Sequence, residues 1–238
     1  MNNSGAVSLD LVLGDRALHW WLLPEKAIWA PSDQTLILAD LHLGKAGHFR
    51  RHGIAIPAAA NLENLARLSR LMDDLRPRKL LLLGDLFHSD LNPEWDGFVT
   101  WLGEERERLP ELDAELILGN HDAMPKKALD NAGIRHAPFR RTTTGILFSH
   151  APEDFAQMGS PPTDALHVCG HWHPGVSLRG SGRQSLRLPC FALLQQKDHM
   201  QLILPAFGGF TGLHSIQPRS GDRCFVVAEN EVLEISKT

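Results

Sequence analysis

The sequence contains no tyrosine, only three cysteines and no long apolar run. Cys169, Cys190 and Cys224 are odd in number and widely spaced, so they form neither a disulfide framework nor a CxxC metal site. Such cysteine usage is typical of a reducing compartment, and we expect a cytoplasmic location. No apolar segment approaches the roughly 18 residues that a transmembrane helix requires, and the first residues lack the pattern of a signal peptide. We therefore expect no association with a membrane.

A net positive charge and a linker are also missing. Lys and Arg number 24 against 28 Asp and Glu, which gives a formal net charge of -4, so no global basic field attracts nucleic acid. A polyanion would have to be held locally, by metal ions or by a short basic patch. The chain contains no repeat and no Gly/Ser-rich tract, and its 238 residues fit one domain. We place that domain at residues 1–238.

The first part of the chain alternates short apolar runs with helical patterns. Residues 7–13 and 17–23 alternate as a β-hairpin does, with a turn at Gly14-Asp15. Leucines at three- and four-residue spacing predict a helix from Pro57 to Leu75, and a second helix is expected to begin at Asn92-Pro93. Five apolar runs predict buried strands: 35–39, 79–83, 114–118, 145–148 and 165–169.

The last part of the chain, residues 175–238, has the pattern of strands and turns. The expected strands are 176–178, 186–194, 202–204 and a final hairpin within 224–235. The prolines between Pro152 and Pro162 predict a surface loop before this part. An α/β first half followed by a β-rich second half predicts two sheets packed face to face, with helices outside.

Histidine is abundant, with 13 residues in the chain, and several histidines stand where the apolar runs end. The five run ends are Asp40-Leu-His42, Gly84-Asp85, Gly119-Asn120-His121-Asp122, Ser149-His150 and Gly170-His171-Trp-His173. Ligands of an open α/β sheet bind beyond the carboxyl ends of its strands, so we expect these side chains to meet. Carboxylate and amide oxygens mixed with imidazole suit Mn²⁺, Fe or Zn²⁺. The glycines permit sharp turns where a Cβ atom would crowd the site.

This ordered set of motifs resembles the calcineurin-like metallophosphoesterase family. Any one motif is common by chance, but all five in order, each at the end of a strand, form a specific pattern that runs from residue 40 to residue 173. The resemblance implies the α/β fold of that family, a four-layer αββα sandwich of two mixed sheets flanked by helices.

The resemblance also implies two divalent metal ions. One ion would be held by Asp40, His42, Asp85 and His173. The other would be held by Asp85, Asn120, His150 and His171, with Asp85 bridging the two. Two ions about 3.5–4 Å apart can lower the pKa of a bridging water and hold a phosphate for in-line attack.

Two further residues receive roles from the same resemblance. His121 would protonate or stabilise the leaving oxygen, and Asp122 would set the tautomer of His121. A supporting role for His121 and a capping role for Asp122 are the alternatives. Many family members carry a second Asp where this chain has Leu86-Phe87-His88. His88 could therefore approach the metals or the substrate, or could hydrogen-bond in support.

A basic segment at residues 44–53 directly follows the first motif. Lys45, Arg50 and Arg51 could grip the phosphates that flank a scissile bond, and His48 lies among them. A solvated charged turn is the alternative, because three cations in ten residues are common.

Four segments extend the resemblance to one bacterial subgroup, the ligase-associated DNA damage response metallophosphoesterases. They are Leu41-His-Leu-Gly-Lys45, Gly84-Asp-Leu-Phe-His-Ser89, Gly182–Phe191 and Leu204–Gly212. The subgroup implies a manganese-dependent phosphodiesterase that acts as a DNA endonuclease in repair, favours single strands, and is associated with a DNA ligase and a helicase. A phosphodiesterase or phosphatase for small molecules such as cyclic nucleotides is the second hypothesis. A non-catalytic scaffold is the third, and the complete ligand set argues against it.

Overall fold

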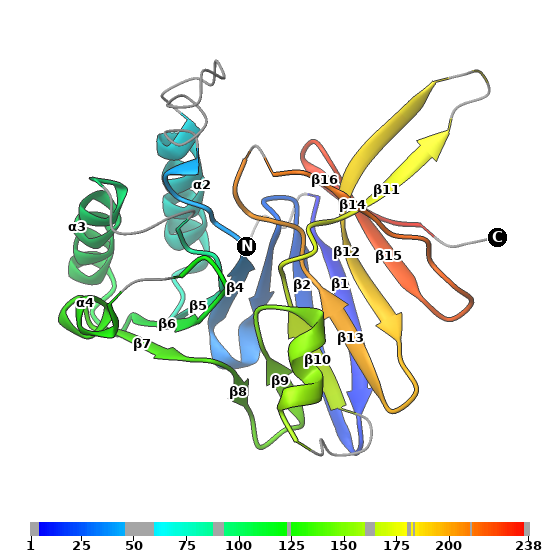
Figure 1. The fold of residues 1–238 in the computed structure, drawn as a ribbon, viewed down its shortest axis with the longest axis horizontal. Coiled ribbons are helices and arrows are strands. Elements are labelled where there is room, and N and C mark those ends of the chain that lie inside the picture. The colour runs from blue at the N-terminus through cyan, green and yellow to red at the C-terminus, as the bar shows by residue number, and fades with distance from the viewer. Residues whose placement is uncertain are drawn as a thin grey trace.

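The structure, a computed structural model, describes residues 5–45, 60–87, 93–122, 125–159, 165–179, 182, 184–209 and 211–235. Figure 1 shows three helices together at one side of the molecule, away from β10, β12 and β13. The helices are α2 (Ala60–Leu75), α3 (Pro93–Arg108) and α4 (Lys126–Asn131). None of the helices in the described ranges is long and apolar enough to cross a membrane.

The first sheet has seven strands in the order β1-β2-β3-β4-β5-β6-β7. The bounds are β1 Val7–Leu13, β2 Arg16–Leu23, β3 Ala27–Ala30, β4 Thr35–Ala39, β5 Lys79–Leu83, β6 Asp113–Ile117 and β7 Ile134–Ala137. Strands β1 to β4 pair antiparallel, whereas β4 to β7 pair parallel. The carboxyl ends of β4, β5 and β6 therefore lie at the same edge of the sheet.

The second sheet has nine strands, in the order β14-β11-β12-β13-β10-β9-β8, with β15 pairing both β12 and β16. The bounds are β8 Arg140–Arg141, β9 Ile146–Phe148, β10 Ala165–Cys169, β11 Pro174–Arg179, β12 Ser185–Gln195, β13 His199–Ile203, β14 His214–Ser215, β15 Arg223–Ala228 and β16 Glu231–Ile235. Strands β9, β10 and β13 are parallel, while β12 and β15 pair antiparallel. The parallel pairing brings the carboxyl ends of β9 and β10 together.

The two sheets pack face to face because their strands alternate apolar side chains to both sides. In β4, Ile37 and Ala39 join the core between the sheets, together with Leu166 and Phe191 from the second sheet. Their neighbours in β4, among them Leu38, pack instead on the helices. Each fully buried Leu or Ile side chain contributes about 1.5–3 kcal/mol. Burial on both faces explains why these strands have nearly continuous apolar sequences.

The predicted sandwich is confirmed, with a sparse outer layer on the second sheet. In the described ranges, that layer contains one helical element, the 3₁₀ helix η2 (Pro152–Gln157), whose Phe155 packs beside the second sheet. The prediction of a plain loop from Pro152 onward is wrong for η2, because Pro152 is buried and begins a helical turn. All three cysteines are free and buried.

The other elements agree with the sequence pattern, apart from a few short ones. The predicted hairpin corresponds to β1 and β2, and the predicted helices correspond to α2 and α3. Strands β3 and β7, helix α4 and the two-residue strands β8 and β14 were not predicted from the sequence. A short 3₁₀ helix, η1 (Pro31–Asp33), connects β3 to β4.

Candidate metal centre

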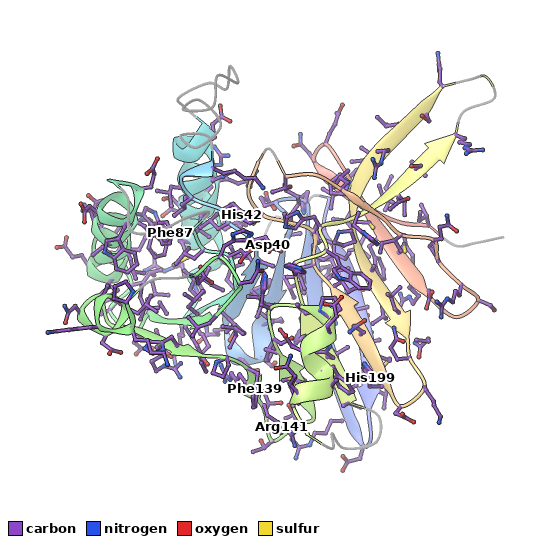
Figure 2. The ribbon with its side chains drawn as sticks, in the orientation of Figure 1. Asp40, His42, Phe87, Phe139, Arg141 and His199 are labelled. Carbon is purple, nitrogen blue, oxygen red and sulfur yellow. The ribbon has the colours of Figure 1, made fainter. Side chains whose placement is uncertain are left out.

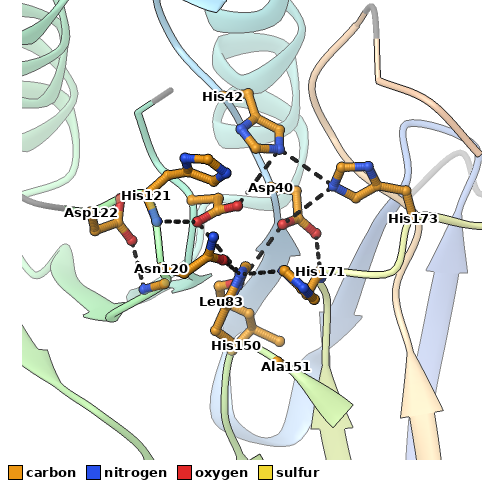
Figure 3. Close-up of polar contacts among 12 residues, drawn as sticks. Asp40, His42, Leu83, Asn120, His121, Asp122, His150, Ala151, His171 and His173 are labelled. Carbon is orange, nitrogen blue, oxygen red and sulfur yellow. Dashed lines mark hydrogen bonds and ion pairs between the residues drawn. The ribbon is translucent and has the colours of Figure 1, made fainter. Parts of the chain in front are cut away.

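The carboxyl ends of five strands bring the predicted ligands to one place between the helices and the second sheet. Figure 2 shows Asp40 and His42 there, far from Arg141 and His199 at the opposite end of the molecule. Figure 3 shows the side chains of the proposed ligands pointing toward one another. Two groups have ligand atoms that all lie within 4.8 Å of one another: Asp40 with His42 and His173, and Asp85 with His150 and His171.

The first group is built from the end of β4 and the loop after β10. Nε2 of His42 lies 3.3 Å from Nε2 of His173. The same nitrogen of His173 lies 3.5 Å from Oδ1 of Asp40, whose side chain is fully buried. Two imidazoles and a carboxylate therefore present their ligand atoms to one small volume.

The second group is built from the ends of β5, β9 and β10. Nε2 of His150 lies 3.4 Å from Oδ1 of Asp85 and 3.0 Å from Nδ1 of His171. The loop after β6 adds Asn120, whose Oδ1 lies 3.0 Å from the same nitrogen of His150. All the residues predicted for the second ion thus converge in the structure.

Asp85 lies between the two groups. Its Oδ1 faces His150 at 3.4 Å, and its Oδ2 lies 3.8 Å from Nε2 of His42. One carboxylate thus directs a different oxygen to each group, which is the geometry that a bridging ligand requires. The side chain of Asp85 is buried, so its charge calls for nearby positive charge.

Backbone groups orient several of these side chains. Nδ1 of His150 lies 3.1 Å from the carbonyl oxygen of Leu83 and can donate to it, which leaves Nε2 as a free ligand atom in the cluster. The backbone N–H of His171 donates to Oδ2 of Asp40 at 2.9 Å, and that of His121 donates to Oδ1 of Asp85 at 3.0 Å. These backbone hydrogen bonds therefore hold the carboxylates of Asp40 and Asp85 in their orientations.

The side chain of Asp40 indicates that these residues suit a divalent metal ion. Its Oδ1 is buried and accepts no hydrogen bond from the described residues. A buried oxygen without a hydrogen-bond donor costs about 1–3 kcal/mol, and a charged one costs more. A cation at this atom removes that cost. Mixed oxygen and imidazole ligands suit Mn²⁺, Fe and Zn²⁺.

The backbone of the cluster adopts an uncommon conformation. Nine non-glycine residues in the described ranges have a positive φ, and five of them are proposed ligands: Asp40, His42, Asp85, His171 and His173. Such a conformation costs on the order of 1 kcal/mol for each residue and persists where surrounding contacts enforce it. The backbone N–H of His42, for example, donates to the carbonyl oxygen of Asp85 at 2.9 Å. The strain is thus concentrated where the ligand atoms converge.

The expectation that glycines prevent crowding is confirmed. Gly84 has φ +73°, and a Cβ atom there would overlap the ring of His150. A Cβ atom at Gly170 would lie 2.5 Å from Oδ2 of Asp40. Any larger residue at these positions would push a proposed ligand out of place.

His121 and Asp122 follow Asn120 in the loop after β6. The ring centroid of His121 lies 6.0 Å from that of His42, so His121 borders the cluster. Asp122 braces two loops: its Oδ1 accepts from the backbone N–H of Leu86 at 2.9 Å, and its Oδ2 accepts from that of Gly119 at 2.8 Å. Burial raises the pKa of Asp122, and the charge of Asp85 adds to the rise, while the Gly119 N–H opposes it.

Lys45 is the one residue of the predicted phosphate-binding set that the structure describes. Its side chain is partly buried, and burial lowers the pKa of its ammonium group. The carboxylates of Asp40 and Asp85 oppose that shift, which places Lys45 within electrostatic reach of the cluster. The other predicted residues, His48, Arg50, Arg51 and His88, lie outside the described residues.

A further support for the turn at Asp40 comes from Phe207, Gly208 and Gly209, here called the Phe-Gly-Gly segment, and has no signal in the sequence. The segment after β13 runs beside the end of β4, where the backbone N–H groups of Phe207 and Gly208 donate to the carbonyl oxygens of Ala39 and Asp40 at 2.8 and 3.0 Å. Arg67 of α2 donates to the carbonyl oxygen of Phe207 and lies over its ring. The Phe-Gly-Gly segment therefore holds the turn that carries Asp40.

Comparison with known proteins agrees with this geometry. The model of the calcineurin-like phosphoesterase family matches residues 34–175, which is 142 of the 238 residues. The chain belongs to the calcineurin-like phosphoesterase family. It is therefore a metal-dependent phosphoesterase, as the motifs predicted. No curated protein sequence matches the chain.

Solved structures add a relative with a named activity. The crystal structure of the nuclease MPE from Pseudomonas putida is 29% identical, with a TM-score of 0.69, and covers 96% of this chain and 100% of that one. This likeness confirms the resemblance to a nuclease subgroup. The phosphoesterase Yfce from E. coli is 14% identical, with a TM-score of 0.47, over 84% of this chain and 97% of that one.

Proposed function

We propose that this phosphoesterase is a DNA endonuclease of the phosphodiesterase type, with two metal ions and a preference for single strands, and that it acts in DNA repair. The observation that carries the proposal is the pair of ligand groups that share Asp85. The nuclease from Pseudomonas putida, similar over nearly the full length of both chains, supports nucleic acid as the substrate.

Each ion would be held by the side chains that converge on it. Asp40, His42 and His173 would hold one, and His150, His171 and Asn120 would hold the other, with Asp85 serving both. When bound, such ions supply an activated water and positive charge for the phosphate oxygens. Mn²⁺ is the proposed metal, because the resemblance to the ligase-associated subgroup implies manganese and the oxygen and imidazole ligands suit it.

His121 would act on the leaving group. A deoxyribose alkoxide is a poor leaving group, and a proton donor beside it typically contributes about 10²–10⁴-fold to the rate. His121 follows the proposed ligand Asn120, and its ring centroid lies 6.0 Å from that of His42, at the border of the proposed metal centre. Asp122 would hold the His121 loop against the loop of Asp85 through its bonds to Gly119 and Leu86.

Lys45 would bind a phosphate next to the scissile bond. Its ammonium group is within electrostatic reach of Asp40 and Asp85, the two carboxylates of the cluster. A role for the rest of the basic segment and an association with a DNA ligase and a helicase remain predictions from the sequence.

The proposal is tested by comparing substrates in one assay. Purified protein with Mn²⁺ is incubated with circular single-stranded DNA, a cyclic nucleotide and bis-nitrophenyl phosphate. We expect the circle to become linear, and the Asp85→Asn variant to leave it intact as the control for contaminating nucleases. An intact circle together with rapid turnover of the cyclic nucleotide would replace the nuclease proposal with the small-molecule hypothesis.

A further inference from the structure

A cavity lined by cationic side chains lies beside the Phe-Gly-Gly segment, outside the metal cluster. It has a volume of about 450 Å³ and lies between the β2–β3 turn, α2, the middle of β12 and the β15–β16 turn. Three cations line it: Lys26, Arg67 and Arg70. Glu25 and Glu229 also line it, so positive charge is in excess.

Two of these cations, Lys26 and Arg67, are partly buried, and each donates to a backbone carbonyl oxygen. Nζ of Lys26 donates to the carbonyl oxygen of Gly208 at 3.4 Å, and Arg67 donates to that of Phe207. Neither cation forms an ion pair with a carboxylate among the described residues, Glu25 and Glu229 included. Buried charges in proteins are ordinarily paired or bind a ligand. Lys26 and Arg67 are only partly withdrawn from water, but they share one cavity without a paired carboxylate, and an anion there would complete both.

The electrostatic cost is visible in both groups. Burial, together with a smaller effect of the positive charge of Arg67, lowers the pKa of Lys26 to about 7. Burial also lowers the pKa of Arg67 to about 10, although Glu25 opposes the shift from a distance. A bound anion would stabilise both charges, since opposite charge favours the ionised form of each.

The cavity is connected to the metal cluster through a single residue. Gly208 donates its N–H to the carbonyl oxygen of Asp40 and accepts from Lys26 with its own carbonyl oxygen. A nucleic-acid strand with one phosphate at the metal cluster would have to cross this segment to bring another of its phosphates to Lys26.

We propose that Lys26, Arg67 and Arg70 form a phosphate-binding site for the substrate strand, separate from the metal cluster. The site takes a phosphodiester group a few nucleotides from the scissile bond. The identification of this phosphate as part of a substrate strand rests on the proposed nuclease function. A free phosphate or a mononucleotide carries the same chemistry, and the experiments separate these sources.

The first experiment compares two substrates of different length. Lys26→Met removes the charge and retains most of the aliphatic stem. We expect the ratio of kcat/KM for a single-stranded oligonucleotide to that for bis-nitrophenyl phosphate to fall roughly tenfold. The slope of log affinity for the oligonucleotide against log salt concentration should become shallower by about 1, the value of one lost phosphate contact. The short diester cannot reach the cavity. Lys126→Met, a change at an exposed lysine of α4, is the matched control and leaves the ratio unchanged.

The outcomes separate binding from support of the fold. Equal losses on both substrates would show that Lys26 only holds Gly208 and the Asp40 turn, and would overturn the proposal. An unchanged ratio would overturn it as well. Arg70→Gln provides a second variant at an exposed side chain, for which a smaller fall of the same ratio is expected.

The second experiment does not depend on cleavage. Thermal unfolding of the full chain with Mn²⁺ is followed with inorganic phosphate, with a mononucleotide and with a short oligonucleotide that carries uncleavable linkages. We expect the oligonucleotide to raise the Tm of the wild type more than that of Lys26→Met. DNA could remain uncleaved while inorganic phosphate or the mononucleotide produces the same Lys26-dependent shift in Tm. That result would retain the anion site, assign it to a free phosphate ligand, and refute the nuclease proposal. No Lys26-dependent shift with any of the three would refute the site.

Discussion

Two clusters of buried polar side chains include neighbouring residues, Ser149 and His150, directly after β9, and they differ in how their hydrogen bonds are satisfied. In the structural cluster, defined as Ser149, His167 and Gln201, every nitrogen of the imidazole has a partner. Gln201 donates to Nδ1 of His167 at 3.1 Å, Nε2 of His167 bonds to Oγ of Ser149 at 2.7 Å, and Ser149 donates to the carbonyl oxygen of Ala151 at 2.9 Å.

The metal cluster has the opposite character. It includes His150, the residue after Ser149. Oδ1 of Asp40 in this cluster accepts no hydrogen bond from the described residues, and five of the proposed ligands have a left-handed backbone conformation. A closed hydrogen-bond network stabilises the fold by itself, whereas an open and strained one needs a ligand to complete it. The comparison indicates that a buried histidine alone does not mark a metal site. The metal cluster differs by combining an unsatisfied carboxylate oxygen with several strained, converging ligand residues.

The largest effect is expected at Asp85. Asp85→Asn removes the charge that both groups share, and activity on every substrate should fall at least about 10³-fold. The Tm without metal should remain the same or rise, because a buried charge is removed. Activity and metal content measured on the same preparation check this expectation, and substantial turnover would contradict the shared role of Asp85.

The next effect is expected at His121. His121→Ala should lower kcat on an oligonucleotide by about 10²-fold, because the alkoxide then leaves without a proton. Turnover of bis-nitrophenyl phosphate should fall much less, because nitrophenolate leaves unaided. Equal losses on the two substrates would argue against a proton donor.

Asp122 should show a smaller effect of another kind. If its carboxylate braces the loops, Asp122→Ala should weaken Mn²⁺ binding about 10–100-fold, the range measured for groups that orient metal ligands. High Mn²⁺ should then restore kcat. If Asp122 instead sets the tautomer of His121, kcat on oligonucleotides stays low at saturating Mn²⁺, and a titration of activity with Mn²⁺ separates the two roles.

The smallest effect on activity is expected in the structural cluster. His167→Gln should leave kcat nearly unchanged but lower the unfolding free energy by about 1–3 kcal/mol, since one partner loses its bond. A changed kcat in fully folded protein would contradict the separation of the clusters.

His167 also predicts a pH dependence. Burial lowers the pKa of His167 to about 3, with the charge of His199 adding to the shift. Between pH 6.5 and 3 the unfolded chain binds a proton that the native state does not, so stability falls as the pH falls. This contribution reaches about 1.4 kcal/mol per pH unit. His167→Gln should show a shallower loss over that range in denaturant titrations.

The sequence indicates for a physical reason that the proposed ligand residues lie close together. Asp40, Asp85 and His150 each follow a run of buried residues, and the edge where parallel strands end fixes where such residues go. The residue types then limit the chemistry. The family motifs supply the grouping of the ligands, which spacing alone does not determine.

Other features depend on contacts that lie far apart in the sequence. Asp122 bonds to the backbone of Leu86, 36 residues away, so its bracing contacts have no local signal. The support of Asp40 by Phe207 and Arg67 joins three separate segments. Short strands such as β3 are missed because four buried residues show no periodicity.

The most direct test is a crystal of the full chain grown with Mn²⁺ and examined by anomalous scattering. Two peaks are predicted, one contacting Asp40, His42 and His173 and the other contacting His150, His171 and Asn120, with Asp85 touching both. A single peak, or peaks that do not share Asp85, would contradict the paired metal centre.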